Sequence, residues 1–223
     1  MRITQADHET VTKAVAEAEL TTSGEIVTVV ANESDGYTDI ALAISAFIAF
    51  TVLVVLAFIP DPVLGLFDAL SDGWNTEWTP SGVFGLASGI GIAVFLIVFA
   101  LTLVPAIRFA LIPGRVKTLR VEDAAIRHFK VGAERRTHGR TGVLIFVSLR
   151  EHRAQIVADS AIAEKVEPEV WGAAMVDMLR EIKAGKLGDG IAAGVRDVGE
   201  ILSPHFPRAD DDENELPDRL IQL

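Results

Sequence analysis

Two long apolar segments interrupt a chain whose remaining segments mix apolar and polar positions. Residues 40–59 and 83–107 contain no charged side chain, and each is long enough to cross about 30 Å of hydrocarbon as an α-helix. In lipid the backbone must satisfy its own hydrogen bonds, so we predict two transmembrane helices rather than strands. Residues 60–82, between them, are rich in proline and glycine and are predicted to be a loop. The pattern therefore predicts a helical hairpin.

The charges that flank this hairpin predict its orientation. The loop carries four carboxylates and no Lys or Arg, whereas basic residues follow the second helix: Arg108, Arg115, Lys117 and Arg120. By the positive-inside rule the loop lies outside and both termini are cytoplasmic. Trp74 and Trp78 in the loop are either interfacial anchors or ordinary loop aromatics.

Small residues recur at spacings of four in both apolar segments. The first has Ala41, Ser45 and Ala49, and the second has Gly85 and Gly89, with Ala87 and Gly91 offset by two. Such rows let helix backbones approach closely. We predict that they pack within the hairpin, and the alternative is a homodimer interface.

The segments on either side of the hairpin have the pattern of an α/β domain. Residues 25–31 and 143–149 are rich in β-branched apolar residues, as in strands covered on both faces. We expect these two strands to be parallel with a right-handed helical connection, and residues 154–159 to pair with the second as a hairpin. Amphipathic helices are predicted over residues 3–20, 121–137, 168–184 and 187–202. The predicted fold is a small mixed sheet flanked by helices and interrupted by the hairpin.

The prediction divides the chain into four parts. Residues 1–37 form the first helix and strand, residues 38–112 the hairpin, and residues 113–207 the rest of the α/β domain. Residues 208–223 begin with an acidic run and contain no long apolar segment, so we predict a disordered tail. The amino terminus lacks the apolar core of a cleavable signal, so the first apolar helix is expected to be a retained anchor.

Composition narrows the function classes. The net charge of −11 argues against nucleic-acid binding, which needs clustered Lys and Arg. The basic residues after the hairpin are better explained by an anionic lipid surface. With no cysteine, disulfides, thiolate nucleophiles and Cys-ligated metals are excluded. The expected partners are the bilayer and another membrane protein.

Three carboxylates form the candidate metal site. In open α/β sheets ligands bind beyond the carboxyl ends of parallel strands. Glu33 and Asp35 follow the first strand closely, and Asp159 ends the third. We predict that they form a weak oxygen-ligand site for Ca²⁺ or Mg²⁺, at a sheet edge that faces the bilayer. The alternative is a solvated acidic turn.

Other polar residues give weaker signals. The five histidines are not spaced as metal ligands, and residues 139–142 form either an anion-binding turn or a plain one. Glu25, at the start of a buried strand, either has a functional partner or is exposed at the strand edge. No nucleophile elbow, Walker loop or His-Glu-x-x-His motif is present, so no catalytic residue is assigned.

The soluble segments resemble one known family. The series Ser23-Gly24-Glu25-Ile26-Val27, Thr141–Ser148, Arg153–Asp159, Val166–Trp171 and the helix at 187–202 resembles the TPM-domain family, and most closely its bacterial integral-membrane branch. The resemblance implies an α/β sandwich tethered to a membrane. Relatives are linked to photosystem maintenance, receptor assembly, calcium binding and phosphatase activity. Two features depart from the family pattern: the inserted hairpin, and Asp159-Ser160-Ala161 in place of a Gly-x-Gly turn.

These observations leave three functional hypotheses. The favoured one is a non-catalytic module that assists the assembly or maintenance of other membrane proteins. The second is a membrane-tethered phosphatase or metal-dependent hydrolase, the one enzyme class that the resemblance suggests. The third is a calcium or lipid sensor.

Overall fold

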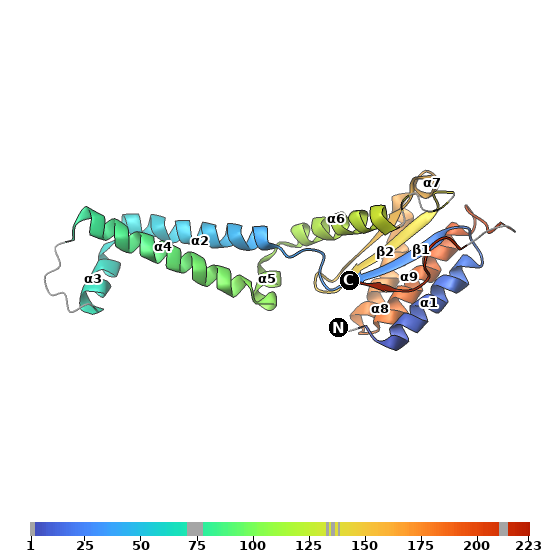
Figure 1. Cartoon of the computed structure of the whole chain (residues 1–223), viewed down its shortest axis with the longest axis horizontal. Coiled ribbons are helices and arrows are strands. Elements are labelled where there is room, and N and C mark those ends of the chain that lie inside the picture. Colours follow the sequence, from blue (N-terminus) through green and yellow to red (C-terminus); the bar gives the residue numbers. More distant parts are fainter. Residues whose placement is uncertain (1–2, 71–77, 133, 135–136, 138, 210–213) are drawn as a thin grey trace. The chain divides into compact units, whose positions relative to one another are not determined.

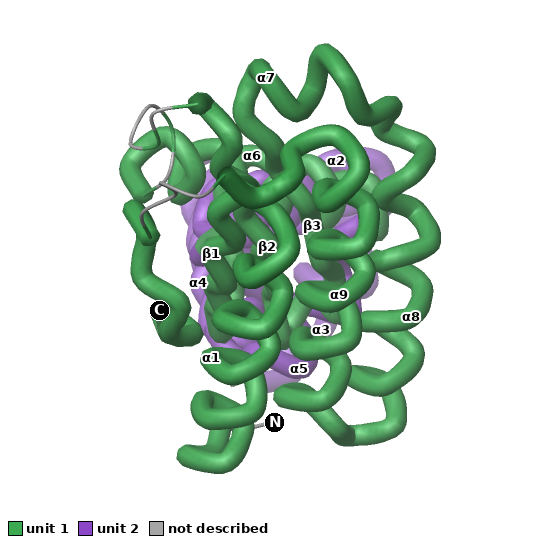
Figure 2. Tube along the Cα trace, turned by 90° about the vertical axis from the view of Figure 1, so that its right-hand side faces the viewer, with its two compact units in different colours: residues 1–35, 114–223 green, residues 36–113 purple. Residues whose placement is uncertain are grey.

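The computed structural model describes residues 3–70, 78–132, 134, 137, 139–209 and 214–223. The chain forms two compact units, coloured separately in Figure 2. Unit 1 consists of residues 1–35 and 114–223, and unit 2 of residues 36–113. Unit 2 is thus inserted into the sequence of unit 1.

Unit 1 contains a four-stranded mixed sheet with the order β3-β2-β1-β4. β1 (Glu25–Ala31) and β2 (Gly142–Ser148) are parallel and pair along their whole length, from Glu25 with Gly142 to Ala31 with Ser148. β3 (Arg153–Ala158) runs antiparallel to β2. Every residue of β1 and β2 is buried, which explains their unbroken apolar pattern. The predicted mixed sheet flanked by helices is confirmed.

Three helices cover one face of the sheet. α1 (Gln5–Glu19) and α8 (Trp171–Lys183) lie on either side of α9 (Leu187–Leu202) (Figure 2). Their apolar side chains form one core with those of the strands, including Val11, Val15, Ile26, Val30, Ile145, Met178, Ile191 and Val198. Glycines of α9 permit this close packing. A Cβ atom on Gly188 would lie 2.8 Å from the Cα atom of Asp7 in α1.

One helix, α6 (Gly114–Gly132), covers the other face. Its residues Val121, Ala124, Ala125 and Phe129 pack with Val27, Val29, Leu144 and Phe146 of the strands. The predicted limits of 121–137 were wrong at both ends. The first two turns of α6 are largely polar and exposed, so they lack the apolar repeat on which the prediction rested.

The carboxyl-terminal segment also differs from the prediction. β4 (Ile221–Gln222) pairs in parallel with Val29 and Val30 of β1, and Leu216 and Leu220 are buried. The last ten residues are therefore part of unit 1 rather than a disordered tail. Residues 210–213 of the acidic run lie outside the described residues.

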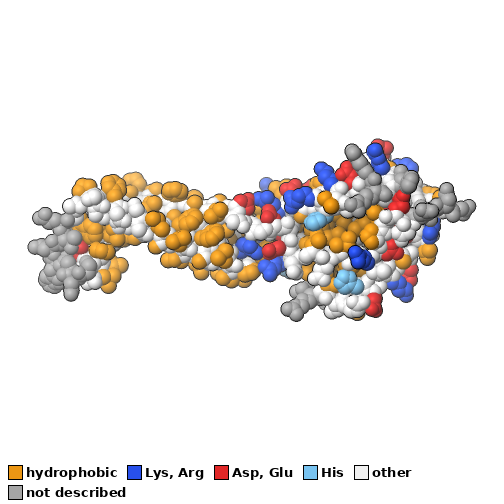
Figure 3. All heavy atoms as spheres, viewed as in Figure 1, with side chains coloured by type: hydrophobic (Ala, Val, Ile, Leu, Met, Phe, Trp, Pro, Cys, Tyr) orange, Lys and Arg blue, Asp and Glu red, His pale blue; other side chains and the backbone are white. Residues whose placement is uncertain are grey.

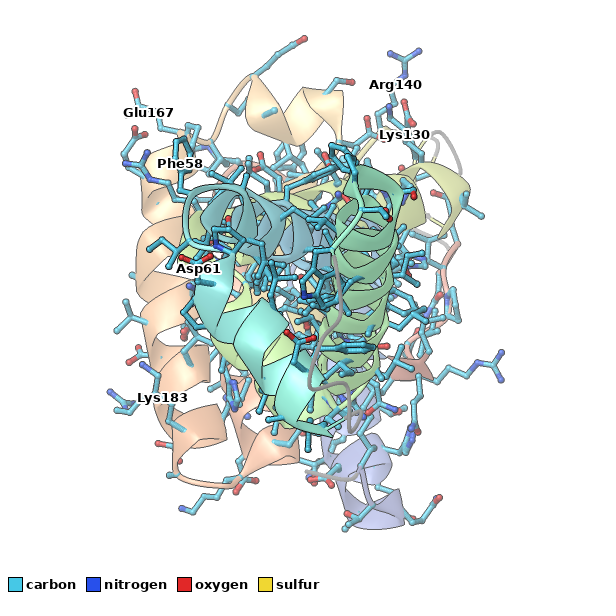
Figure 4. The ribbon with its side chains drawn as sticks, turned by 90° about the vertical axis from the view of Figure 1, so that its left-hand side faces the viewer. Phe58, Asp61, Lys130, Arg140, Glu167 and Lys183 are labelled. Carbon is cyan, nitrogen blue, oxygen red and sulfur yellow. The ribbon has the colours of Figure 1, made fainter. Side chains whose placement is uncertain are left out.

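Unit 2 is built on two helices that lie side by side, α2 (Thr38–Phe58) and α4 (Pro80–Thr102) (Figure 1). Residues 60–82 are not all loop, because α3 (Asp61–Leu70) follows α2 directly. Phe58 and Asp61 are labelled at this junction in Figure 4. Proline is tolerated in the first turn of a helix, so Pro62, the second residue of α3, does not prevent it.

The second apolar segment is also broken. The prediction of one helix over 83–107 was wrong, because α4 begins at Pro80 and ends at Thr102, and α5 (Pro105–Leu111) follows. The hydroxyl of Thr79 caps α4 by accepting a hydrogen bond from the amide of Gly82. A proline cannot continue a preceding helix, so Pro105 begins a new one.

The small residues of the two helices differ in their surroundings. In α2, Ala41, Ser45 and Ala49 are buried, as expected for packing within the hairpin. In α4 the close approach is made by Gly91, whose Cβ position lies 3.1 Å from Leu53. Gly85 and Gly89 have no atom within 4 Å of theirs. They do not serve the packing of α2 on α4.

The outer surfaces of α2 and α4 are apolar and exposed. Both helices are long and apolar enough to cross a membrane, and 17% and 6% of their most apolar windows are buried. Hydrophobic side chains extend along the hairpin in Figure 3. A core helix of a soluble protein would instead be mostly covered.

Candidate functional site

A polar cluster lies at the carboxyl ends of β1 and β2, and Glu151 is at its centre. Glu151 belongs to the tight turn between β2 and β3, where His152 has a φ of 51°. Only 4% of Glu151 is exposed. Its Oε1 accepts hydrogen bonds from the amide (2.8 Å) and hydroxyl (2.7 Å) of Ser34, and its Oε2 accepts one from the Ser148 hydroxyl. This carboxylate joins the turn to the loop after β1.

Two ion pairs flank Glu151. Nη1 of Arg150 lies 3.4 Å from Oε2 of Glu33, and Nη1 of Arg120 on α6 lies 3.2 Å from Oδ2 of Asp35. The four side chains are partly exposed, so each pair contributes little stability alone. Together with Glu151 they connect residues 33–35 to α6 and to the turn between β2 and β3. We call these residues and Arg120, Ser148, Arg150 and Glu151 the carboxyl-edge cluster.

Asp159 does not belong to this cluster. Because β3 is antiparallel to β2, its end lies beside the start of β2, and the Asp159 amide donates to the carbonyl of Gly142. Oδ1 of Asp159 accepts a hydrogen bond of 2.6 Å from the amide of Ser160 and caps the short helix α7 (Ser160–Ala163). The structure therefore does not bring Asp159 together with Glu33 and Asp35.

The donor set for a divalent cation is also incomplete. Among the described residues, no group of three or more His, Asp or Glu side chains is placed to hold a metal ion. Ca²⁺ needs six to eight oxygen ligands, whereas Glu33 and Asp35 each face an arginine. The cluster as it stands does not fit the Ca²⁺ or Mg²⁺ site expected from the sequence.

Glu25, at the opposite end of β1, holds the carboxyl-terminal segment. Only 3% of Glu25 is exposed, and its Oε2 accepts a 3.0 Å hydrogen bond from the amide of Leu216. The expectation of an exposed strand-edge carboxylate was wrong. The nearby turn is structural, since the Thr141 amide donates to the Thr137 hydroxyl and the Thr141 hydroxyl donates to the Ser23 carbonyl.

Among the titratable groups outside the cluster, His128 and Asp197 have perturbed pKa values. Burial, with the positive charge of Arg127, lowers the pKa of His128, whose ring stacks on Phe146 at 5.6 Å. Burial, with the carboxylates of Asp177 and Glu200, raises the pKa of Asp197. Both groups lie on helices that pack against the sheet rather than at the carboxyl-edge cluster.

Sequence reasoning missed Ser148 and Glu151. Residues 150–153 read Arg-Glu-His-Arg, a run of polar side chains that is usually typical of a solvent-exposed turn. The feature of the sequence that could have revealed these two residues is the predicted parallel pairing of the two apolar strands. Alignment of Ala31 with Ser148 places the turn beside residues 32–35, where a carboxylate can accept hydrogen bonds from the loop.

Comparisons with known proteins agree with this architecture. Residues 107–201 match the family model described as the TPM domain. The NMR structure of BA42 protein from the psychrophilic bacterium Bizionia argentinensis is similar, with a TM-score of 0.57 and 17% identity. That alignment covers 100% of this chain and 97% of BA42. A search of curated proteins found no match.

The fold and the comparisons together define the class of protein. A mixed parallel and antiparallel sheet with helices on both faces is an α/β domain. Residues 107–201 match the TPM domain, and the BA42 structure, at its low identity, supports the fold alone.

Proposed function

We propose that unit 2 anchors this TPM-domain protein in a bacterial inner membrane. The supporting observation is the exposure of its apolar helices: Phe58 is 82% exposed, and Phe47 and Phe84 are each 73% exposed. Each buried CH₂ group is worth about 0.8 kcal/mol, so transfer of this surface to lipid is strongly favourable. The distribution of Lys and Arg favours cytoplasmic termini and a cytoplasmic unit 1.

Unit 1 then acts as a non-catalytic interaction module that assists assembly or maintenance of another membrane protein. The carboxyl-edge cluster is the observation that carries this part of the proposal. Its acidic side chains already bind serines and arginines of their own chain. Those contacts hold residues 33–35, which directly precede unit 2 in the sequence. The cluster thus has a structural role at the start of the anchor.

The test is cross-linking in native membranes. The tagged full chain and an anchor-only control, residues 36–113, are cross-linked, captured and compared by mass spectrometry. An interaction module predicts a reproducible membrane-protein adduct that requires unit 1. Identical adducts from both chains would contradict the proposal.

A second assay separates the module from a hydrolase. Purified full chain is incubated with phosphomonoesters and Mg²⁺ or Ca²⁺, beside the double variant Glu33→Ala/Asp35→Ala. The proposal predicts no turnover from either protein. Turnover by the wild type that the double variant loses would establish the hydrolase instead.

A further inference from the structure

The short helix α3 turns away from the hairpin at the end of α2. α2 ends at Phe58, and Pro60 prevents it from continuing. α3 then runs across the direction of α2 rather than along it, as both Figure 1 and Figure 4 show. The 21 residues of α2 give about 32 Å of helix, which matches the roughly 30 Å of a hydrocarbon layer. In a bilayer that α2 spans, α3 therefore begins at the edge of the hydrocarbon and lies along the membrane surface.

α3 has an apolar side and a polar side. The helical repeat places Val63, Leu66, Phe67 and Leu70 on one side and Asp61, Gly65, Asp68 and Ala69 on the other. The hairpin leaves much of the apolar side uncovered, since Leu66 is 60% exposed and Leu70 is 79% exposed. Helices of this kind typically lie in the plane of a membrane interface, with the apolar side turned toward the acyl chains.

An apolar cavity of about 300 Å³ lies between α3 and the hairpin. Val63 and Leu64 of α3 line it together with side chains of α2 and α4, and among the described lining residues Ser88 alone carries a polar side chain. A buried water molecule normally makes two to four hydrogen bonds, whereas this cavity offers one hydroxyl. Acyl chains can instead occupy the space and make van der Waals contact with its walls. The cavity therefore favours lipid rather than water beneath α3.

Trp78 joins α3 to the start of α4. Its Nε1 donates a 3.2 Å hydrogen bond to Oδ2 of Asp68, and its ring packs edge-on against Phe67 with 5.5 Å between the ring centroids. Trp78 directly precedes Thr79, which caps α4. Indole rings are enriched at the membrane–water interface, where the ring is in apolar contact and the N–H is hydrogen-bonded. These contacts support the interfacial alternative for Trp78.

We propose that α3 is a membrane-surface helix in the outer leaflet, with Leu66 and Leu70 in contact with acyl chains and Asp61 facing water. Its partner is the phospholipid surface itself. Because α3 has no Lys or Arg, its attachment depends on apolar contact rather than on attraction to anionic headgroups. The inference rests on the proposed membrane anchor and adds a third helix that contacts lipid. Interfacial anchors of this kind help to set the tilt of spanning helices.

The test is spin labelling of the full chain in nanodiscs of phosphatidylethanolamine and phosphatidylglycerol. The chain has no cysteine, so single labels can be placed at four exposed neighbours. Leu66→Cys and Leu70→Cys report on the apolar side, and Gly65→Cys and Ala69→Cys are the matched controls on the polar side. The depth of each label follows from its collision rates with O₂ and with a water-soluble nickel complex. We expect the labels at the leucine positions to lie about 5–10 Å below the headgroup boundary, and the two control labels to lie at or above it.

Two results would overturn the proposal. Equal access of the nickel complex to all four labels would place α3 in water. Exclusion of both O₂ and the nickel complex from the leucine positions would show that protein, rather than lipid, covers the apolar side. A fifth label at Phe84→Cys in α4 reports on the anchor separately. If that label is reached by O₂ and not by the nickel complex, either result removes the surface helix and leaves the anchor standing, whereas access of the nickel complex to it would contradict the anchor itself.

Discussion

Replacing Glu151 tests whether the carboxyl-edge cluster holds the loop after β1. In Glu151→Ala, the Ser34 amide and the hydroxyls of Ser34 and Ser148 lose their acceptor. Hydrogen bonds to charged groups are worth about 1.5–3 kcal/mol each, but Ser34 is half-buried and water can replace part of the loss. The expected destabilisation of unit 1 is therefore about 2–4 kcal/mol.

The assay is urea unfolding in mild detergent, followed by fluorescence of the buried Trp171 in a Trp74→Phe/Trp78→Phe background. Glu33→Ala is the matched control, because it removes a partly exposed carboxylate from the same loop, and it should cost less than about 1 kcal/mol. Equal effects of Glu151→Ala and Glu33→Ala would refute the assigned role of Glu151.

Three further predictions concern the helices. Gly188→Ala should destabilise unit 1 by about 1–3 kcal/mol, because the added Cβ atom would collide with the backbone of α1. The control is Gly172→Ala, which has open space at its Cβ position and should be neutral or stabilising in the same urea titration. The raised pKa of Asp197 means that the folded state binds this proton more tightly, so its contribution falls as pH rises from 3.8 through the raised pKa. Asp197→Asn should remove that fall in unfolding measured from pH 4 to 7, and an unchanged profile would contradict the assignment. Gly91→Leu should lower the thermal stability of the hairpin, measured by circular dichroism in detergent, while Gly85→Leu should not. If Gly85 instead lies in the alternative homodimer interface, Gly85→Leu will reduce self-association.

Elements with a strong local pattern were predicted accurately. The uninterrupted β-branched run gave β1 its observed limits, Glu25–Ala31, and α9 was also placed at Leu187–Leu202. β1 is buried along its whole length, as its unbroken apolar pattern indicated, and the buried positions of α9 follow the helical repeat. The parallel pairing of β1 with β2 followed from the helical connection between them.

Features decided by distant contacts were not predictable in this way. β4 has two residues and no periodicity, and its position depends on Glu25 and on leucine sites in two separate cores. The role of Glu151 depends on register across two strands. Asp159 was expected beside Glu33 and Asp35, but β3 runs antiparallel to β2. The hairpin was correctly predicted, yet its direction puts the residue after β3 beside the start of β2, at the opposite end of the sheet.

Membrane insertion of unit 2 is the central claim, and cysteine labelling tests it most directly. The chain has no cysteine, so single substitutions can be placed at Asp61 in α3, at Phe84 in α4 and at the exposed His205 of unit 1. A membrane-impermeant maleimide is applied to right-side-out and inverted inner-membrane vesicles. The account predicts that Asp61→Cys reacts from the outside, His205→Cys from the cytoplasmic side and Phe84→Cys from neither. Labelling of Asp61→Cys and His205→Cys from the same side, or ready labelling of Phe84→Cys, would contradict it.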